Sequence, residues 1–197
     1  VMPLPPYIKR AATQEDHRWY QTVFAKHEGA IAAPTAGLHF TEELFGRLRQ
    51  AAINVATVTL HVGPGTFKPV TTERIEDHQI GAETFMVSEE TVRAIQETKR
   101  ACGRVVAVGT TVVRTLETLG QEKGEVVPMS DESRLFVTPG FQFKIVDVLM
   151  TNFHLPRTTL LMLVSAFAGT DRIRSAYEEA VKERYRFYSY GDAMLIL

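Results

Sequence analysis

The sequence has a single cysteine, Cys102, among its 197 residues. A lone cysteine excludes an internal disulfide and any paired-cysteine metal or redox site. The histidines lack the spacing of metal ligands, and no acidic cluster is dense enough to hold an ion. We therefore expect no metal and a reducing, cytoplasmic setting.

The sequence also lacks a long apolar run. The longest, Leu160 to Ala168, contains Ser165 and is far shorter than the ~20 residues that span a bilayer. It predicts a buried helix and no membrane partner. No basic-then-apolar leader opens the chain. The proline-dense start Val-Met-Pro-Leu-Pro-Pro resembles a linker, so we expect a fragment of something longer.

The sequence also has almost no net charge. Twenty-two Lys and Arg against 23 Asp and Glu leave a formal charge of −1. No global positive field attracts this chain to nucleic acid, so such binding requires a local basic patch.

The pattern of apolar and polar residues predicts alternating strands and helices. Asp16 is expected to cap a helix that ends at Gly29, and Thr41 and Ser88 to cap two more. A further helix begins after Gly109, and residues 120–131 read as a loop. The remaining helices are expected at 158–168 and 171–185, and the strands at Ala30–Ala33, Ile53–Val62, Arg104–Val108, Leu135–Thr138, Phe143–Val146 and Ala193–Leu197.

This order predicts one α/β domain over residues 1–197, layered α/β/α, with a largely parallel or mixed sheet. In such sheets, ligands bind outside the carboxyl ends of strands. Four segments place polar residues there: 34–40, 60–67, 108–114 and 151–156. We expect them to converge on one site.

Each candidate also has a plainer interpretation. Gly109-Thr110-Thr111 offers free N–H groups and hydroxyls to an anion, or is a simple helix cap; it lacks the glycine spacing and lysine of a P-loop. A lone histidine is more often structural than catalytic, but His39, His61 and His154 occupy matching loops. Glu83 sits in a polar connection, where most charges are only solvated.

The segment Tyr185–Tyr190 interleaves aromatic side chains with arginine. Such a segment can stack a nucleic-acid base, or it can pack in the core at a helix end. Core packing is favoured for Phe187, and less for Tyr188 and Tyr190.

Several longer motifs occur together and in order: Pro3-Leu-Pro-Pro-Tyr-Ile8, Tyr20-Gln-Thr-Val-Phe24, Ala33-Pro-Thr-Ala-Gly-Leu-His-Phe40, Val58-Thr-Leu-His-Val-Gly63, Gly109-Thr-Thr, Thr151-Asn-Phe-His-Leu-Pro156 and Tyr185-Arg-Phe-Tyr-Ser-Tyr-Gly-Asp-Ala-Met194. The chain thereby resembles, end to end, the later part of the S-adenosylmethionine:tRNA ribosyltransferase-isomerase family of queuosine biosynthesis. The earlier part of the family's pattern, including an inserted β-barrel domain, is not visible here. Gly81 and Val112 depart from the family's pattern, so no indispensable side-chain role is assigned to either position.

The resemblance implies transfer of the ribosyl portion of S-adenosylmethionine to 7-aminomethyl-7-deazaguanine at the tRNA wobble position. Adenine and methionine leave and the ribose rearranges, giving epoxyqueuosine. S-adenosylmethionine is then a co-substrate, and no other cofactor is expected. We expect a monomer, and we expect this chain alone to be inactive because the site borrows residues from the absent part.

Residue chemistry within that reaction gives three sets of candidates. Acid–base chemistry is assigned to His39, His61, His154 and Asp192. Substrate binding is assigned to Thr35, Gly37, Gly63, Glu83, Thr110, Thr111, Arg114 and Asn152, with Arg114 on the methionine carboxylate by a two-pronged contact and Glu83 as a carboxylate alternative in the acid–base chemistry. Contacts to tRNA are assigned to Lys9, Arg10, Arg18, Arg184, Arg186 and Tyr188.

Two rivals stay open. A methyltransferase that uses S-adenosylmethionine would normally show a glycine-rich first strand–helix turn and an acidic residue about 20 positions later, which the sequence lacks. A non-catalytic tRNA-binding module is the second.

Overall fold

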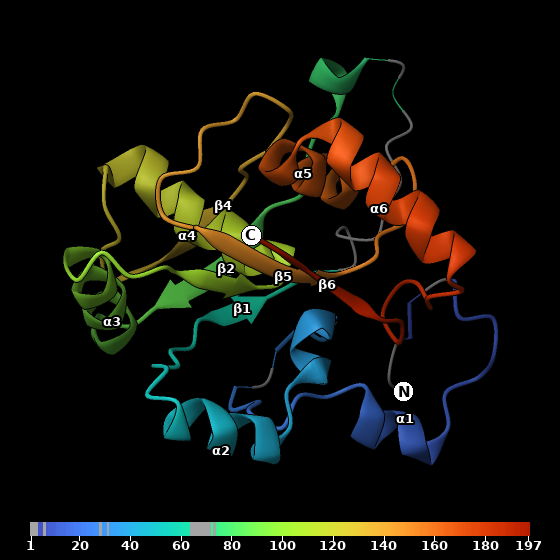
Figure 1. Ribbon diagram of the computed structural model, residues 1–197, viewed down its shortest axis with the longest axis horizontal. Helices are drawn as coiled ribbons and strands as arrows, with labels where there is room; N and C mark the ends of the chain where they lie inside the picture. Colours follow the sequence, from blue (N-terminus) through green and yellow to red (C-terminus); the bar gives the residue numbers. More distant parts are fainter. Residues whose placement is uncertain (1–3, 6, 28, 31, 64–71, 73) are drawn as a thin grey trace.

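A computed structural model describes residues 4–197, except 6, 28, 31, 64–71 and 73. Within that range the strands form two separate three-stranded sheets (Figure 1). The α/β class is confirmed, but the single, largely parallel or mixed sheet is replaced by one antiparallel sheet and one mixed sheet.

The antiparallel sheet has the order β1-β2-β4, with β1 at Thr59–His61, β2 at Glu83–Val87 and β4 at Met129–Ser133. The mixed sheet has the order β3-β5-β6. Its β3 (Val106–Val108) runs parallel to β5 (Val148–Asn152), and its last strand runs antiparallel to β5. That last strand, β6, covers Ala193–Ile196, as the sequence predicts within one residue.

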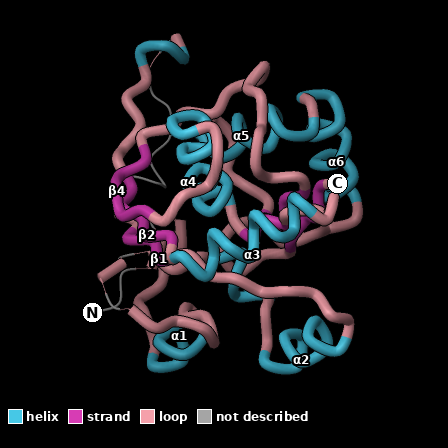
Figure 2. Tube along the Cα trace, turned by 90° about the vertical axis from the view of Figure 1, so that its left-hand side faces the viewer, coloured by secondary structure: helices cyan, strands magenta, loops and turns pink. Residues whose placement is uncertain are grey.

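Helices lie on both sides of the strands. They are α1 (Gln14–Trp19), α2 (Glu42–Gln50), α3 (Glu89–Arg100), α4 (Thr110–Lys123), α5 (Thr159–Ala168) and α6 (Thr170–Lys182), with short 3₁₀ turns at Thr35–His39 (η1) and Ile75–Asp77 (η3). Figures 1 and 2 both show α5 and α6 on one side of the strands and α1 and α2 on the other. No helix in the described part of the chain has the length and apolar content needed to cross a membrane.

Hydroxyl caps fix where several helices begin. Thr41 Oγ1 accepts a hydrogen bond from Leu44 N at 3.1 Å, and Ser88 Oγ accepts one from Thr91 N at 3.3 Å. Acidic residues follow both caps in the first turn, where they favour the positive end of the helix dipole. Both predicted caps are confirmed.

The first predicted helix is wrong in its bounds. Thr13 is the N-cap, and the Asp16 carboxylate bonds back to its backbone N–H at 2.7 Å. The helix ends at Trp19 rather than Gly29. It ends there because the chain turns to bury Tyr20, whose ring meets that of Tyr190 edge-on at 5.8 Å between centroids.

Several predicted strands are also wrong. No strand forms at Leu135–Thr138, at Phe143–Val146 or over the described residues of Ala30–Ala33, and Ile53–Val62 shrinks to β1. Of the loop predicted at 120–131, residues 120–123 belong to α4 and residues 129–131 belong to β4.

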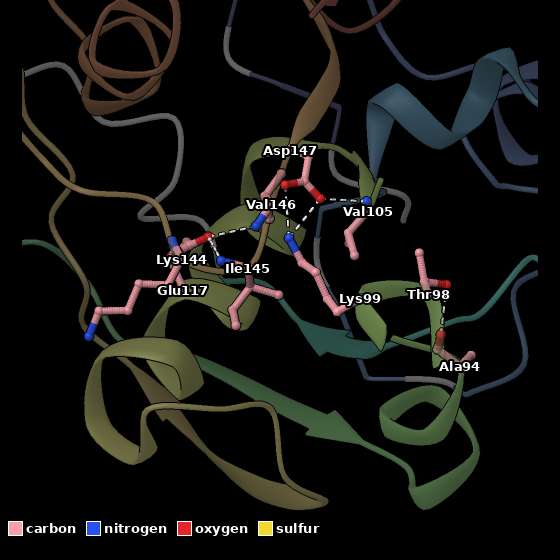
Figure 3. Close-up of polar contacts among 9 residues, drawn as sticks. All are labelled: Ala94, Thr98, Lys99, Val105, Glu117, Lys144, Ile145, Val146 and Asp147. Atoms are coloured by element: carbon pink, nitrogen blue, oxygen red, sulfur yellow. Dashed lines mark hydrogen bonds and ion pairs between the residues drawn. The ribbon is translucent and has the colours of Figure 1, made fainter. Parts of the chain in front are cut away.

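Glu117 explains the missing strand at 143–146. Its fully buried carboxylate accepts hydrogen bonds from three successive backbone amides, at 2.8 Å from Lys144 and 2.9 Å from Ile145 and Val146 (Figure 3). The amides that a strand partner would use are therefore bonded to a side chain of α4. This clamp fixes the chain just before β5, which carries part of the site.

Asp147, the next residue, connects the same segment to Val105, which directly precedes β3. The Asp147 carboxylate accepts from Val105 N at 2.7 Å and from Lys99 Nζ at 2.7 Å (Figure 3). Phe85, Leu119, Leu149 and Leu163, from β2, α4, β5 and α5, are among the largest fully buried side chains, so the core lies between the strands and these helices.

Candidate substrate-binding site

One cavity is lined by all four of the segments that the sequence predicts to converge. They contribute residues 34–36, Val62, Gly109–Thr111 and 151–155, together with Tyr7, Tyr188 and Ser189 from the two ends of the chain. Residues 64–67 of the second segment lie outside the described residues. Each of the four segments thus places at least one described residue in the lining, and their other described residues lie outside it.

Parallel strands explain why two of the segments meet. Val108 at the end of β3 is in register with Met150 of β5, so both strands open at the same edge of the sheet. Gly109 N donates to Met150 O at 2.8 Å, which holds the start of α4 against β5.

The N-terminus of α4 points its first N–H groups at this edge. Gly109 has φ +100°, a conformation that favours glycine, and no side chain caps the helix among the described residues. Thr110 and Thr111 add hydroxyls to the same corner of the cavity. The uncapped amides and the helix dipole together favour a bound anion such as a carboxylate.

Asn152, the last residue of β5, also lines the cavity. Its side-chain Nδ2 lies 3.1 Å from His39 Nε2, on η1. Its Oδ1 is buried and has no hydrogen-bond partner in the described part of the chain. A buried amide oxygen without a partner is costly, and in native proteins it often marks a place where a ligand or water binds.

His39 is electrostatically coupled to Asp192. Burial lowers the pKa of His39, while the charge of Asp192 raises it by a smaller amount. The pKa of Asp192 is itself lowered, chiefly by Arg186, whose Nη2 lies 2.8 Å from the carboxylate. At neutral pH the imidazole is therefore neutral and the carboxylate is charged.

His154 is held within the cavity lining by two hydrogen bonds. Its Nε2 lies 3.1 Å from Thr151 Oγ1, and its backbone N–H donates to the Tyr177 hydroxyl at 2.8 Å. Burial lowers the pKa of His154 to about 4. A neutral imidazole at pH 7 can accept a proton but is a poor acid, which restricts His154 to the role of a base.

His61 lies apart from the other histidines. It faces a groove on the antiparallel sheet, beside Lys26, His27, Thr84 and Ser130. Successive residues of a strand point to opposite faces, so Val62 lines the cavity and His61 does not. The expectation that His61 shares the cavity is therefore corrected.

Arg114 and Glu83 also differ from expectation. Arg114 Nη1 and Glu83 Oε2 form an ion pair at 2.8 Å, with both side chains about 5% exposed. The guanidinium also donates to Leu135 O and Ser133 O, and neither residue lines the cavity. Arg114 lies one turn further along α4 than Thr111 and is buried outside the cavity lining.

The remaining candidates are spread between the cavity, the interior and the surface. Thr35 lines the cavity, Gly37 packs against Phe24 and Thr22, and Gly63 lies outside the lining. Tyr188 lines the cavity with an unusual φ of +73°.

The basic residues predicted to contact tRNA lie on the surface. Lys9, Arg18 and Arg184 are exposed. Arg10 pairs with Asp16 at 2.5 Å and Arg186 pairs with Asp192, so these two guanidinium groups already bind carboxylates. Phe187 packs on Phe153 and Tyr177, as the core interpretation predicts.

The sequence did not single out four polar residues of the lining: Tyr7, Thr151, Thr158 and Ser189. Tyr7 hydrogen-bonds Ser189, and its ring lies 5.0 Å from that of Tyr188. Tyr7, Thr151 and Ser189 all belong to the longer motifs that carry the family resemblance, which was the available signal.

No Asp, Glu, Lys or Arg lines the cavity in the part of the chain that the structure describes. Recognition there depends on hydroxyls, backbone amides, one carboxamide and neutral imidazole.

Known proteins match this chain over nearly its full length. The family model described as "Queuosine biosynthesis protein" matches residues 1–196. The protein named S-adenosylmethionine:tRNA ribosyltransferase-isomerase of Pelobacter propionicus is 57% identical over 99% of this chain and 57% of its own length. Its namesake from Trichlorobacter lovleyi is 55% identical over 100% of this chain and 58% of its own.

A solved structure shows the same likeness. The S-adenosylmethionine tRNA ribosyltransferase of Thermotoga maritima is 49% identical, with a TM-score of 0.65, over 82% of this chain and 51% of that one. The chain thus spans a little over half the length of the curated relatives it matches.

Proposed function

The chain belongs to the queuosine biosynthesis protein family, and on that premise we propose that it is the part of a tRNA ribosyltransferase-isomerase that binds S-adenosylmethionine. The ribosyl group of this co-substrate is transferred to the aminomethyl group of 7-aminomethyl-7-deazaguanine in tRNA. Adenine and methionine leave, and the product is epoxyqueuosine. The observation that carries the proposal is the convergence of four motif segments on one uncharged cavity.

Two features of the cavity lining suit two charged groups of S-adenosylmethionine, the methionine carboxylate and the sulfonium. The uncapped N-terminus of α4, with Thr110 and Thr111, supports binding of the methionine carboxylate. Tyr7 and Tyr188 supply adjacent aromatic rings, whose faces attract a cation such as the sulfonium.

Proton transfer falls to the neutral imidazoles. The sulfonium acidifies the neighbouring 5′ carbon, and His154, inside the lining, is positioned to take a proton from the bound substrate. His39 does not line the cavity itself, but it contacts Asn152, which does. A positioned base of this kind contributes roughly 10²–10⁴-fold in rate.

Adenine leaves more readily when a proton donor is near. His154 and His39 are neutral and Asp192 is ionised, so none of them suits this role. The Tyr7 hydroxyl lines the cavity and stays protonated, since burial raises its pKa. We assign it the role of proton donor to adenine.

Turnover is the test. Residues 1–197 are incubated with S-adenosylmethionine and precursor tRNA, beside a chimera in which they replace the matching 57% of the Pelobacter propionicus relative. We expect the chimera to release adenine and methionine in equal amounts and to form epoxyqueuosine, and residues 1–197 alone to bind without turnover.

Three other results would change this conclusion. Transfer of the methyl group to tRNA would establish a methyltransferase instead. Binding of tRNA without any reaction by the chimera would establish a non-catalytic module. Turnover by residues 1–197 alone would overturn the expectation that the site is incomplete.

A further inference from the structure

The side chain of Asn152 combines three properties. It is 3% exposed, it lines the cavity, and its Oδ1 has no hydrogen-bond partner among the described residues. Leaving such an atom unpaired is unfavourable, so a buried and unpaired amide oxygen at a cavity wall is an acceptor available to a ligand that donates a hydrogen bond.

The orientation of this carboxamide is set by His39. Because the imidazole is neutral, its Nε2 can accept one of the two Nδ2 protons across the 3.1 Å contact. Nε2 accepts in the tautomer that carries the single ring proton on Nδ1. The second Nδ2 proton and Oδ1 then form a planar donor–acceptor pair.

We infer that Asn152 reads the adenine base of S-adenosylmethionine, accepting from the exocyclic N6 amino group and donating to the adjacent ring nitrogen. A carboxamide makes this two-point contact with adenine because both groups are planar and their donors and acceptors alternate. The inference rests on the proposed function, since it takes S-adenosylmethionine as the ligand. Asn152 is the only carboxamide in the cavity lining, as far as the described residues show.

The other base in the proposed reaction, the deazaguanine of tRNA, fits this position less well. A nucleotide within tRNA brings a phosphate on each side, and no Lys or Arg lines the cavity among the described residues. Among the described residues of the lining, the one anion-binding feature is the N-terminus of α4, with Thr110 and Thr111. That matches the single carboxylate of S-adenosylmethionine.

The test compares equilibrium binding of S-adenosylmethionine with its 6-oxo analogue, S-inosylmethionine. The 6-oxo group replaces the N6 donor with an acceptor, which opposes Asn152 Oδ1. We expect the wild-type protein to bind the analogue roughly 10- to 100-fold more weakly. Asn152→Ala should reduce this ratio to near one.

Two further variants serve as controls for this ratio of affinities. His154→Gln alters a neighbouring polar group of the lining and should keep the wild-type ratio, even though turnover falls. If Asn152→Ala does not fold by circular dichroism, Asn152→Ser keeps a short polar side chain and should also lose the ratio. A merely structural role for Asn152 would weaken both ligands equally and leave the ratio unchanged.

The outcomes separate this inference from the proposed function. Equal wild-type affinity for the two ligands, or a ratio that survives Asn152→Ala, overturns the inference even if adenine is released normally. Weaker binding of precursor tRNA to Asn152→Ala, with the ratio retained, also overturns it and moves the contact to deazaguanine. A ratio that depends on Asn152, together with a chimera that releases no adenine, supports the inference and overturns the proposed function.

Discussion

At the residue scale, the charge of His154 links the cavity to stability. Its pKa is about 4 in the folded protein, against about 6.5 in an unfolded chain. Above pH 6.5 both states are neutral there, and stability is unaffected. As the pH falls from 6.5 towards 4, only the unfolded chain gains the proton, so the folded state loses stability by roughly 1.4 kcal/mol per pH unit.

This gives a pH-dependent prediction. Between pH 7.5 and 4.5, the free energy of unfolding of the wild type should fall by roughly 2–3 kcal/mol more than that of His154→Gln. Urea unfolding at the two pH values measures the difference, and losses at other acidic groups cancel in the comparison. Equal losses in the two proteins would mean that His154 is not held neutral by burial.

The Arg114–Glu83 pair gives a second prediction at this scale. Glu83→Gln leaves a buried guanidinium without its counter-charge, and should lower the free energy of unfolding by about 3 kcal/mol. Glu83→Leu combined with Arg114→Met should recover most of that loss, because neither charge then remains. Unchanged stability in Glu83→Gln, with weaker S-adenosylmethionine binding in Arg114→Met, would restore the carboxylate-binding role of Arg114.

At the element scale, the clamp between α4 and the segment before β5 holds the chain as it enters the strand that ends at Asn152. Glu117→Gln removes the charge and sets an NH₂ group against backbone N–H donors, and should cost roughly 3 kcal/mol. Glu122→Gln, exposed on the same helix, is the matched control and should change stability by no more than ~0.5 kcal/mol. Chemical denaturation checks both; equal stability of the two variants would contradict the clamp.

The same elements show what the sequence can and cannot predict. Helices capped by Thr41 and Ser88 were predictable because a hydroxyl followed by acidic residues is a local signal. β2 was missed because only one of its faces is buried and Glu83 is part of that face. The chain at Lys144–Val146 reads as a strand, but a carboxylate 27 positions earlier along the chain takes its amides.

The candidate site, too, was predictable from the sequence only in part. The sequence identified the four segments, since each follows a strand or carries a motif, and all four line the cavity. It did not determine which side chains point inward. His61 and Val62 are neighbours in the chain, and the strand places them on opposite faces.

At the scale of the whole molecule, the near-zero net charge makes tRNA binding depend on a few exposed cations. We predict that tRNA affinity falls steeply with salt, and that Lys9→Glu, Arg18→Glu and Arg184→Glu each reduce the slope of log affinity against log salt by about one. Lys182→Glu is the control, because Lys182 is already paired with Glu179 at 3.2 Å. Salt-independent binding would count against tRNA as a direct partner of this chain.

The most direct test of the cavity as the S-adenosylmethionine site is a ¹H–¹⁵N NMR titration of residues 1–197 with that ligand. We predict the largest shifts at the amides of Gly109, Thr111, Asn152, His154 and Tyr188, all in the cavity lining. The amides of Thr84 and Ser130, in the groove beside His61, should be unaffected. Shifts concentrated in that groove, or none at millimolar ligand, would contradict the account.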